Sequence, residues 1–537
     1  MIRIGLLLDS TQIQAWQAEA IRQVITTGFA EISLLIFNNS PKPSGDPSPF
    51  LYKAYRKIDR LVFNSKQDAF EFRDIASLVS AETKQLKVSP IQKKYRDFFP
   101  AESIEQIRSH DLDVLLRFGF RILSGEILNV PKHGVWSYHH GDPSVYRGGP
   151  PAFWEVMKAL PITGVVLQRL TEKLDQGQVI YQSFTQTNPL SVQRNANSLF
   201  WLSSTFVSRV IREIQQLGWE ARENGLQNEP SGSDSPLWKP PSNWQLLPLM
   251  FQLIGRNWSR KLRELVKKPH WTIGLYTPVQ EGKSLHLGPN LIQEWEHPDP
   301  QNFYWADPFP VLIGEKEFVL VEEFDKRNKR GRIVCLERSA NGLQIHPALE
   351  ESWHLSYPFV WQENGKIFLI PESAEAGKVF LYQAIDFPTR WEQEKVLLDA
   401  EAYDPTLIKS ERVYWLFVNQ KAHPECSPFD ELHLYFSESL EEPSWTPHPQ
   451  NPIVSDVRKS RPAGCIFLQD GKLFRPAQDS GLRYGHRVHI QEIVCLTKTA
   501  YVEKTVQTLE SAPDFAQGVH TYNQGKLGVW IDLFRRK

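Results

Sequence analysis

A chain of 537 residues is too long for one ordinary hydrophobic core, and this length predicts about two to four domains. The composition, 41% hydrophobic and 23% charged, is typical of a water-soluble globular protein and contains no apolar run of membrane-spanning length. The formal net charge of −1 provides no general attraction to polyanions, so the sequence argues against a nucleic-acid partner.

The cysteines and the N-terminus favour a cytoplasmic location. The four cysteines are far apart, with no CxxC pair and no histidine at zinc spacing, and are expected to be buried thiols: Cys335, Cys426, Cys465 and Cys495. The first residues, MIRIGLLLDSTQ, contain no small-residue cleavage site. We therefore expect a reducing setting and no metal site.

The chain opens with a strand-helix-strand pattern. Residues 2–8 are apolar almost throughout, which is typical of a parallel strand buried on both faces. A helical pattern over residues 13–28 ends at Gly28, and a second strand is expected over residues 30–37. This order predicts a doubly wound α/β sheet. No G-x-G-x-x-G follows the first strand, which disfavours a nucleotide cofactor.

A further buried strand is predicted over residues 113–120, and it leads into the turn Arg117 to Leu123. In open α/β sheets, ligands bind beyond the carboxyl ends of the strands, so this turn is a candidate binding element. The alternative is an ordinary buried strand end.

Residues 134–180 contain an unusual density of imidazole, carboxylate and turn residues. Ser137, His139, His140 and Asp142 lie close together, and Tyr146-Arg147-Gly148 follows them. A strand is expected over residues 164–170, then the turn Leu174-Asp175-Gln176-Gly177 and a strand over residues 178–184. A carboxylate at such a turn can be directed at a histidine of the preceding loop. Each polar residue alone would be expected as a solvated loop residue.

This segment resembles the catalytic core of the folate-dependent formyltransferases, which include methionyl-tRNA, glycinamide ribonucleotide and sugar N-formyltransferases. Their signature is a loop N-x-H-x-S-L-L-P-x-Y-R-G, a strand beginning Gly-Val/Ile-Thr (here at Gly164), and a turn Leu-Asp-x-Gly. His139 stands at the catalytic histidine and Asp175 at the catalytic aspartate. Ser137 replaces the catalytic asparagine, and the S-L-L-P portion reads Gly141-Asp142-Pro143-Ser144.

The resemblance implies a role for each matching residue. His139 would act as general base, Asp175 would orient it, and Ser137 would stabilise the oxyanion. The donor would be 10-formyltetrahydrofolate, with its pterin held largely by main-chain atoms of the turn at Arg117, Phe118, Gly119, Phe120 and Ile122. The acceptor amine would be bound by His140, Asp142, Tyr146 and Arg147.

Residues 196–218 are expected to form one amphipathic helix that covers the sheet. Residues 222–243 are rich in Pro, Ser, Gly and Asn, which indicates a linker. A helix over residues 244–268 has apolar residues and a basic polar side, and packing between domains is favoured over membrane docking.

The remaining residues form a degenerate repeat. Four residue-proline pairs each open a strand, at spacings of 50, 47 and 57 residues, and a second aromatic or aliphatic strand follows each pair: Asp307-Pro308, Tyr357-Pro358, Asp404-Pro405 and Arg461-Pro462. A fifth, weaker unit covers residues 520–534. These spacings predict a five-bladed β-propeller. The repeat also resembles the N-terminal propeller domain of glucosamine inositolphosphorylceramide transferases.

Equivalent residues of propeller blades face a common channel, so the four openings are expected to converge. The second-strand ends are expected beside them: Glu322, Glu372, Asn419 and Gln478. Asp307, Glu372, Asp404 and Arg461 form the predicted propeller site, which suits a carbohydrate. The alternatives are a structural hydrogen-bonded closure of the blades and a glycosidase.

The sequence thus predicts a formyltransferase-like α/β domain over residues 1–220, a linker and helix over 221–269, and an all-β five-bladed propeller over 270–537. The leading hypothesis is an N-formyltransferase that acts on an amino sugar, with nucleotide-linked sugars favoured over tRNA. One rival is an inactive formyltransferase fold that binds carbohydrate. The other is a glycosidase or glycosyltransferase with its chemistry among Asp307, Glu372 and Asp404.

Overall fold

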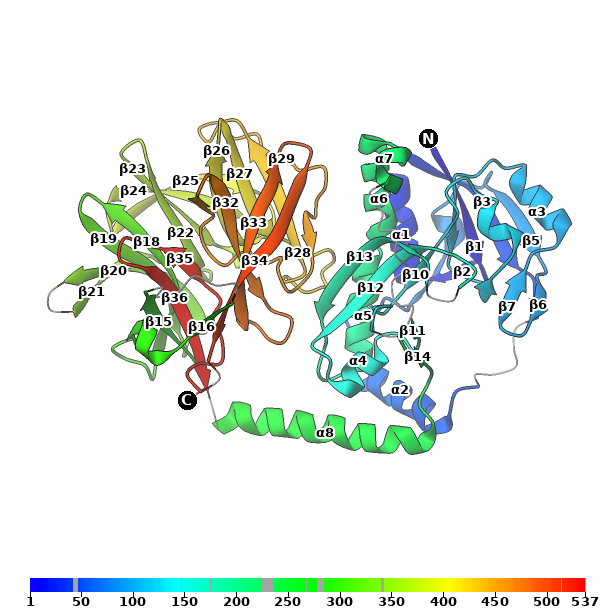
Figure 1. Ribbon diagram of the computed structural model, residues 1–537, viewed down its shortest axis with the longest axis horizontal. Helices are drawn as coiled ribbons and strands as arrows, with labels where there is room; N and C mark the ends of the chain where they lie inside the picture. Colours follow the sequence, from blue (N-terminus) through cyan, green and yellow to red (C-terminus); the bar gives the residue numbers. More distant parts are fainter. Residues whose placement is uncertain are drawn as a thin grey trace. The chain divides into compact units, whose positions relative to one another are not determined.

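The computed structural model describes residues 1–536 except 42–46, 146, 174–175, 225–234, 267, 278–283, 340–341 and 513. These residues form two compact units (Figure 1). Unit 1 contains residues 1–258 and 422–427, and unit 2 contains residues 259–421 and 428–537.

Unit 1 is built on one seven-stranded sheet in the order β13-β12-β10-β8-β1-β3-β5. The strands are β1 (Ile2–Leu8), β3 (Ala30–Asn38), β5 (Lys84–Val88), β8 (Val114–Arg117), β10 (Val135–His139), β12 (Ile162–Arg169) and β13 (Gln178–Gln186). The strands from β5 to β10 are parallel, whereas β12 and β13 continue the sheet antiparallel. The doubly wound α/β prediction is confirmed for this part of the chain.

Hydrophobic clusters cover both faces of this sheet, which explains why β1 is apolar from Ile4 to Leu8. Leu6 and Leu8 pack in a cluster with α1 (Ala15–Thr26), and Leu7 packs on the other face with α3 (Ala101–Arg108). Alternate residues of a strand point to opposite faces, so a strand covered on both sides is apolar along its covered part. Arg3, near the start of β1, pairs with Glu31.

The single helix expected over residues 196–218 is two helices, α5 (Val192–Ser203) and α6 (Phe206–Leu217). The break occurs at a run of three hydroxyl residues. Ser203, Ser204 and Thr205 donate their side-chain hydrogens to the carbonyls three residues earlier, at 2.7 to 2.9 Å. Such bonds compete with the helical hydrogen-bond pattern, and an apolar period does not reveal them.

Part of the predicted linker packs on unit 1. Residues 219–224 form the helix α7, and β14 (Leu237–Trp238) pairs in parallel with β11 (Arg147–Gly148). Gly148 has a φ of +85°, and a Cβ there would lie 2.4 Å from the carbonyl oxygen of Trp238. Only glycine allows this approach.

The long helix α8 (Asn243–Val266) is continuous through Pro248 (Figure 1). Its buried residues, Leu246 and Leu253, join a cluster with α2 (Phe50–Val62) and α4 (Phe153–Lys158). None of the described helices is both long and apolar enough to cross a lipid bilayer.

The described residues of unit 2 form five antiparallel sheets, apart from β16, which joins its sheet in parallel. Three sheets are consecutive along the chain: β18 to β21 (Phe303–Ile313, Lys316–Asp325, Arg330–Ser339, Gly342–Leu349), β22 to β25 (Ser356–Glu363, Lys366–Glu372, Val379–Asp386, Arg390–Leu398) and β26 to β29 (Tyr403–Ser410, Val413–Asn419, Glu431–Ser437, Thr446–Pro447). A fourth combines β16 (Ser284–Leu287) with β31 to β34 (Phe467–Gln469, Lys472–Asp479, Arg487–Leu496, Tyr501–Ser511).

The fifth sheet joins the two ends of unit 2. It contains β15 (Pro269–Tyr276) and β17 (Ile292–Trp295) from the start of the unit, and β35 (Tyr522–Gln524) and β36 (Val529–Arg536) from the end of the chain. Strands β15 and β36 pair along their whole length, from Pro269 opposite Arg536 to Tyr276 opposite Val529. The C-terminal strand therefore completes the sheet that the first strand of this unit begins.

We expect Gly119→Ala to destabilise unit 1. Gly119 follows β8, and a Cβ there would lie 2.5 Å from the amide nitrogen of Asp9 and 2.6 Å from the carbonyl carbon of Leu8. The backbone must shift to admit it, at a cost of about 1–3 kcal/mol in the free energy of unfolding. Gly255→Ala in α8 is the control, since its Cβ would meet nothing within 4 Å. It should stabilise the helix by about 0.5–1 kcal/mol. Urea denaturation of both variants checks the pair, and a wild-type midpoint for Gly119→Ala would contradict the expectation.

Candidate functional site

Ser137 and His139 lie on one face of β10, near its carboxyl end. They are separated by one residue, and alternate side chains of a strand point the same way. Both side chains are buried, with exposed fractions of 2% and 8%. The two residues that the sequence assigns to oxyanion stabilisation and general base catalysis are therefore neighbours on one surface.

His140 faces the other side of the strand. Its ring stacks on Phe200 at 3.5 Å and meets Trp16 edge-on at 5.1 Å, and Tyr138 contacts the same tryptophan. Its Nε2 lies 3.0 Å from Ser203 Oγ. Burial, and secondarily His139, holds the pKa of His140 well below its ordinary value, so this imidazole is neutral. The structure thus does not bring His140 to the face that carries His139.

Arg117, the last residue of β8, connects the neighbouring turn to Ser137. Its Nε and Nη2 donate to the carbonyls of Arg121 and Phe120 at 3.1 and 3.0 Å, and Nη1 donates to Ser137 Oγ at 3.1 Å. The serine oxygen thus accepts from a cation, and its own hydrogen is directed at the carbonyl of Tyr138, 3.5 Å away. Sequence reasoning placed Arg117 only beside a cofactor.

The main-chain amides of the turn at residues 118–121 already donate hydrogen bonds to groups of the protein. Phe118 and Gly119 donate to Leu7 O, Phe120 donates to Asp9 Oδ1 at 2.8 Å, and Arg121 donates to Asp97 Oδ2 at 2.9 Å. The carbonyls of Phe120 and Arg121 accept from Arg117, and a carbonyl oxygen can accept a second hydrogen bond. The turn can therefore accept hydrogen bonds from the N–H groups of a pterin. Ile122 lies in the short strand β9 (Ile122–Leu123).

The loop after β10 is held by its own polar groups. Asp142 Oδ1 accepts from the amide and the hydroxyl of Ser144, at 2.9 and 2.6 Å. Arg147 Nε donates to the carbonyl of Ser235 at 3.1 Å. Asp142 and Arg147 thus contribute to the fold of the loop. Tyr146 and Asp175, which the sequence also assigns to the site, lie outside the described residues.

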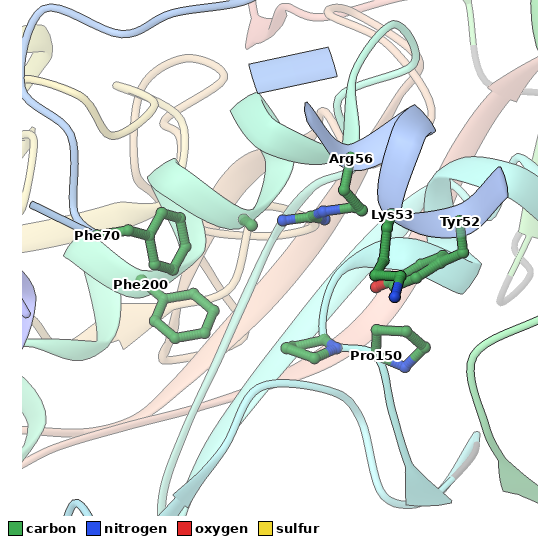
Figure 2. Close-up of a pocket in the computed structure, with 8 residues that line it drawn as sticks. Tyr52, Lys53, Arg56, Phe70, Pro150 and Phe200 are labelled. Atoms are coloured by element: carbon green, nitrogen blue, oxygen red, sulfur yellow. The ribbon is translucent and has the colours of Figure 1, made fainter. Parts of the chain in front are cut away.

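A pocket of about 460 Å³ opens beside this loop (Figure 2). It is lined by Tyr52, Lys53, Arg56, Phe70, Pro150, Pro151, Ala196 and Phe200. Figure 2 shows Arg56 extending from α2 toward the rings of Phe70 and Phe200, with Pro150 across from Tyr52. Phe200 is the ring that stacks on His140. Sequence reasoning missed this pocket, because Lys53 and Arg56 belong to no recognisable motif.

In unit 2, three of the four residue-proline pairs share an uncommon backbone conformation. Asp307, Tyr357 and Asp404 have φ values of +51°, +44° and +48°, and the strand register shifts at each of them. Such bulges redirect side chains, and a non-glycine residue with positive φ costs of the order of 1–3 kcal/mol. The repetition of a costly conformation at equivalent positions indicates that each side chain is directed to one place.

Hydrogen bonds join the predicted propeller-site residues. The amide of Tyr357 donates to Asp307 Oδ2 at 3.2 Å, and the amide of Asp404 donates to Glu372 Oε2 at 3.3 Å. The guanidinium of Arg461 donates to both oxygens of Asp404 and lies 3.4 Å from Glu372 Oε2. The structure thus brings together the residues at these four openings, which are far apart in the sequence. We call this group the central cluster.

Two other predicted neighbours of the cluster differ in their contacts. Gln478 Nε2 lies 3.3 Å from Asp404 Oδ2 and donates to Pro462 O at 2.9 Å. Asn419 is fully buried, and its amide donates to the carbonyl of Pro428 at 3.1 Å, so it supports a neighbouring loop.

The C-terminal segment contributes three further members that the sequence did not single out. Asp532 Oδ2 accepts from the amide of Asp307 at 3.2 Å and forms an ion pair with His520. Thr521 Oγ1 donates to Asp307 Oδ1 at 2.9 Å. The carboxylate and imidazole atoms of Asp307, His520 and Asp532 lie within 4.8 Å of one another, which is compatible with a metal ion. The sequence contained one signal for Asp532: in the alternating strand GVWIDLF it occupies the position equivalent to Glu372.

Acids outnumber bases in the central cluster, and the pKa values reflect this. Burial raises the pKa of Asp307 to about 6, with Asp532 and Asp404 adding to the effect and His520 opposing it. Burial, and next the charge of Asp307, raises the pKa of Glu322 well above its ordinary value. Burial, and next Asp404, does the same to the pKa of Glu372. The cluster therefore retains protons at pH values at which ordinary carboxyl groups have lost them.

Comparison with known families agrees with this division of the chain. Residues 57–194 match the family model described as Formyl transferase, and residues 293–526 match the model described as Glucosamine inositolphosphorylceramide transferase 1, N-terminal. The N-terminal α/β part therefore contains a formyltransferase-family domain, followed by a β-rich region of the second kind. Both resemblances expected from the sequence are confirmed.

Relatives match separate parts of the chain. Glucosamine inositolphosphorylceramide transferase 1 of Arabidopsis thaliana is 36% identical over 212 residues, which is 38% of this chain and 28% of the relative. Methionyl-tRNA formyltransferase of Prochlorococcus marinus (strain MIT 9215) is 31% identical over 153 residues, 28% of this chain and 45% of the relative. The chain thus spans less than half the length of either. A sugar N-formyltransferase structure from Shewanella sp. aligns at a TM-score of 0.28 and 11% identity, covering 44% of this chain and 76% of that one.

We expect Glu322→Gln to raise the thermal stability of unit 2 at pH 8 and to leave it close to wild type at pH 4. The folded-state pKa of Glu322 lies above its ordinary value of 4.5, so its contribution to stability is complete below that pH and is lost as the pH rises through the folded-state pKa. The substituted amide cannot ionise and keeps the side-chain volume. Glu315→Gln is the control, because that side chain is 98% exposed. Melting temperatures of the three proteins at the two pH values test this prediction. If the melting temperature of Glu322→Gln depends on pH as that of the wild type does, the raised pKa of Glu322 is contradicted.

Proposed function

We propose that the chain is an N-formyltransferase that moves a formyl group from 10-formyltetrahydrofolate to the amine of a nucleotide-linked amino sugar. The observation that carries the proposal is the pair Ser137 and His139 on one face of β10, at the carboxyl end of a strand in a formyltransferase-family domain. Ligands of open α/β sheets bind at such ends.

In the proposed reaction the folate supplies an activated formyl group. The acceptor nitrogen attacks the formyl carbon, a new N–C bond forms, and the bond from that carbon to the folate nitrogen breaks. His139 takes the proton that the amine loses and delivers it to the departing nitrogen, so the reaction needs no other co-reactant. Asp175 would orient His139 and stabilise its charged form.

Ser137 is proposed as the donor to the developing oxyanion, in the position where related enzymes carry asparagine. Arg117 supports this role, because Nη1 donates to Ser137 Oγ at 3.1 Å, and the serine hydrogen makes only a long contact of 3.5 Å with Tyr138 O that an oxyanion can replace. The guanidinium also adds positive charge close to the site of the negative oxygen. A charged partner compensates for the shorter reach of a hydroxyl compared with an amide.

We propose that the pocket beside the loop holds the nucleotide part of the acceptor. Phe200 places the pocket on the His140 side of β10, so the sugar would reach Ser137 and His139 past the carboxyl end of that strand. Lys53 and Arg56 offer two cations to phosphate groups, and the rings of Tyr52, Phe70 and Phe200 offer flat surfaces to a base. This combination suits the nucleotide part of an activated sugar. Its volume of about 460 Å³ lies in the usual range for small-molecule sites.

For unit 2 we propose a five-bladed propeller whose central cluster binds carbohydrate. The five sheets, the pairing of β15 with β36 and the contacts among equivalent residues support this architecture. The Arabidopsis relative is named for the transfer of glucosamine, which favours a glycan ligand.

Binding is favoured over hydrolysis in unit 2, because Arg461 is ion-paired with Glu372 and Asp404. A pair of catalytic carboxyl groups requires one free base and one free acid. The tests below also distinguish this proposal from two rival functions. The rivals are an inactive formyltransferase fold that only binds carbohydrate, and a glycan-processing enzyme.

We expect His139→Ala and Asp175→Asn to lower formyl transfer by about 10²- to 10⁴-fold, the usual contribution of a general acid-base group. The assay supplies 10-formyltetrahydrofolate and a panel of nucleotide-linked amino sugars, and measures formylated product. His110→Ala, on the loop after α3, is the control and should retain wild-type rates. More than about a tenth of the activity in His139→Ala would refute its role. Wild-type protein that binds the folate but forms no product would support the inactive rival.

We expect the full chain to bind a saccharide on a glycan array without cleaving it, and Asp307→Asn and Glu372→Gln to lose at least about tenfold in affinity through lost charged hydrogen bonds. Both substitutions keep an oxygen that accepts the backbone bonds of the cluster. Asp399→Asn, at an 80% exposed side chain, is the control. Folded wild-type protein that binds no saccharide removes the proposed role. Cleavage that disappears in the two variants would favour the glycan-processing rival.

A further inference from the structure

One face of α8 exposes a continuous row of large apolar side chains. Trp244, Phe251 and Trp258, seven residues apart, are 84%, 73% and 71% exposed. Leu247 and Ile254 lie between them at 37% and 48%, and the row continues to Leu262 and Leu265 at 64% and 79%. Spacings of three and four residues place all of these side chains on one side of the helix.

The opposite side of the helix packs against unit 1. Leu246 and Leu253 are buried in the core of unit 1. Arg256 donates to the carbonyls of Val156 and Met157 at 2.7 and 3.1 Å. These contacts fix the rotation of α8 about its axis, so the exposed row cannot turn inward without breaking them.

The second half of the helix is basic: by helical spacing Lys261 flanks the row, whereas the arginines lie on the other sides of the helix. Arg256, Arg260, Lys261 and Arg263 stand against a single acid, Glu264, and Lys268 follows the helix in the sequence. Lys261 and Arg263 are exposed. A helix with tryptophan, phenylalanine and leucine on one face and lysine and arginine on its other faces has the composition of helices that lie in the interface of a lipid bilayer.

We propose that α8 docks the protein on the surface of an anionic lipid bilayer. The aromatic and aliphatic row enters the boundary between headgroups and acyl chains, Lys261 at its edge meets the negative headgroups, and the exposed Arg263 adds attraction at longer range. The proposal concerns peripheral binding, and it does not depend on the formyl-transfer function. It replaces the expectation, from the sequence, that this helix serves only to pack between domains.

A second copy of the chain is a poorer occupant for this face. With Trp244 at an a position, the row fills the a and d positions of a heptad until Lys261 falls at d. Of the described flanking e and g positions, Glu264 is charged, whereas Pro248, Gly255 and Asn257 are not. Coiled-coil dimers favour branched aliphatic cores and opposite charges at those flanks.

The start of α2 contacts the start of α8. Asn243 Oδ1 accepts from the amide of Leu51 at 3.0 Å, which joins the first turns of the two helices. Phe50, the residue before Leu51, is 72% exposed. An exposed aromatic residue of α2 therefore lies close in the chain to the point where α2 meets the start of α8.

The test is flotation of the full chain with two kinds of vesicle, phosphatidylcholine alone and phosphatidylcholine with about one third phosphatidylserine. We expect wild-type protein to float with the anionic vesicles and much less with the neutral ones. The triple variant Trp244→Ser/Phe251→Ser/Trp258→Ser should lose at least about 100-fold in partitioning, because each ring removes a large apolar area. Its exposed sites leave the fold intact, which circular dichroism checks.

Two further variants separate the contributions. Lys261→Glu/Arg263→Glu should lose the preference for anionic vesicles while keeping weak binding. Phe72→Ser/Ile91→Ser/Tyr95→Ser removes three apolar residues of unit 1 that are 64%, 50% and 77% exposed, and should float like wild type.

Three results would overturn the proposal. The first is wild-type protein that floats with neither kind of vesicle. Light scattering would then show whether it is a monomer or a dimer that the α8 variant disrupts, and either result overturns the proposal. The second is undiminished flotation of the α8 triple variant. The third is equal losses in the α8 variant and in the control variant, which would indicate nonspecific adsorption.

Discussion

The alternation of side chains along β10 is the constraint on which the candidate site depends. The strand is hydrogen-bonded to β8 on one side and to β12 on the other, so its rotation is fixed. Tyr138 and His140 then face the helices, where Trp16 and Phe200 enclose the His140 ring. Ser137 and His139 necessarily face the other way. A shift of one residue in this register would exchange the packing pair for the chemical pair.

Burial affects the polar groups of this strand in different ways. His140 is desolvated, and the resulting low pKa makes it a neutral packing residue despite its place in a polar loop. Ser137 is equally enclosed, yet its contact with Arg117 supplies a charged hydrogen-bond donor. Arg117 is held by two carbonyls of the adjacent turn, so the folding of that turn determines where its charge lies.

In unit 2, charged side chains are brought together by a strained backbone conformation that recurs at equivalent positions. Asp307, Tyr357 and Asp404 each adopt a positive φ at a register shift, and each then joins the same hydrogen-bonded group. Burying several carboxylates is costly unless they are paired or protonated. Arg461 and His520 provide the pairing, and the raised pKa values of Glu322 and Glu372 show that protonation completes it.

The sequence by itself determined the α/β nature of the first part, the family of its loop and the repeat of the second part, because these rest on short-range patterns. It could not reveal that Ser203 to Thr205 divide one apolar period into two helices. Nor could it pair Asp307 with Asp532, 225 residues away, since periodicity says nothing about partners across sheets.

The helix α8 illustrates the same division. Its sequence shows one apolar face through Leu246 and Leu253 and another through Trp244 and Phe251, and either could have been buried. Only the tertiary structure decided between them. The first face fits against α2 and α4, and because a helix is rigid about its axis, burying that face leaves the aromatic one exposed.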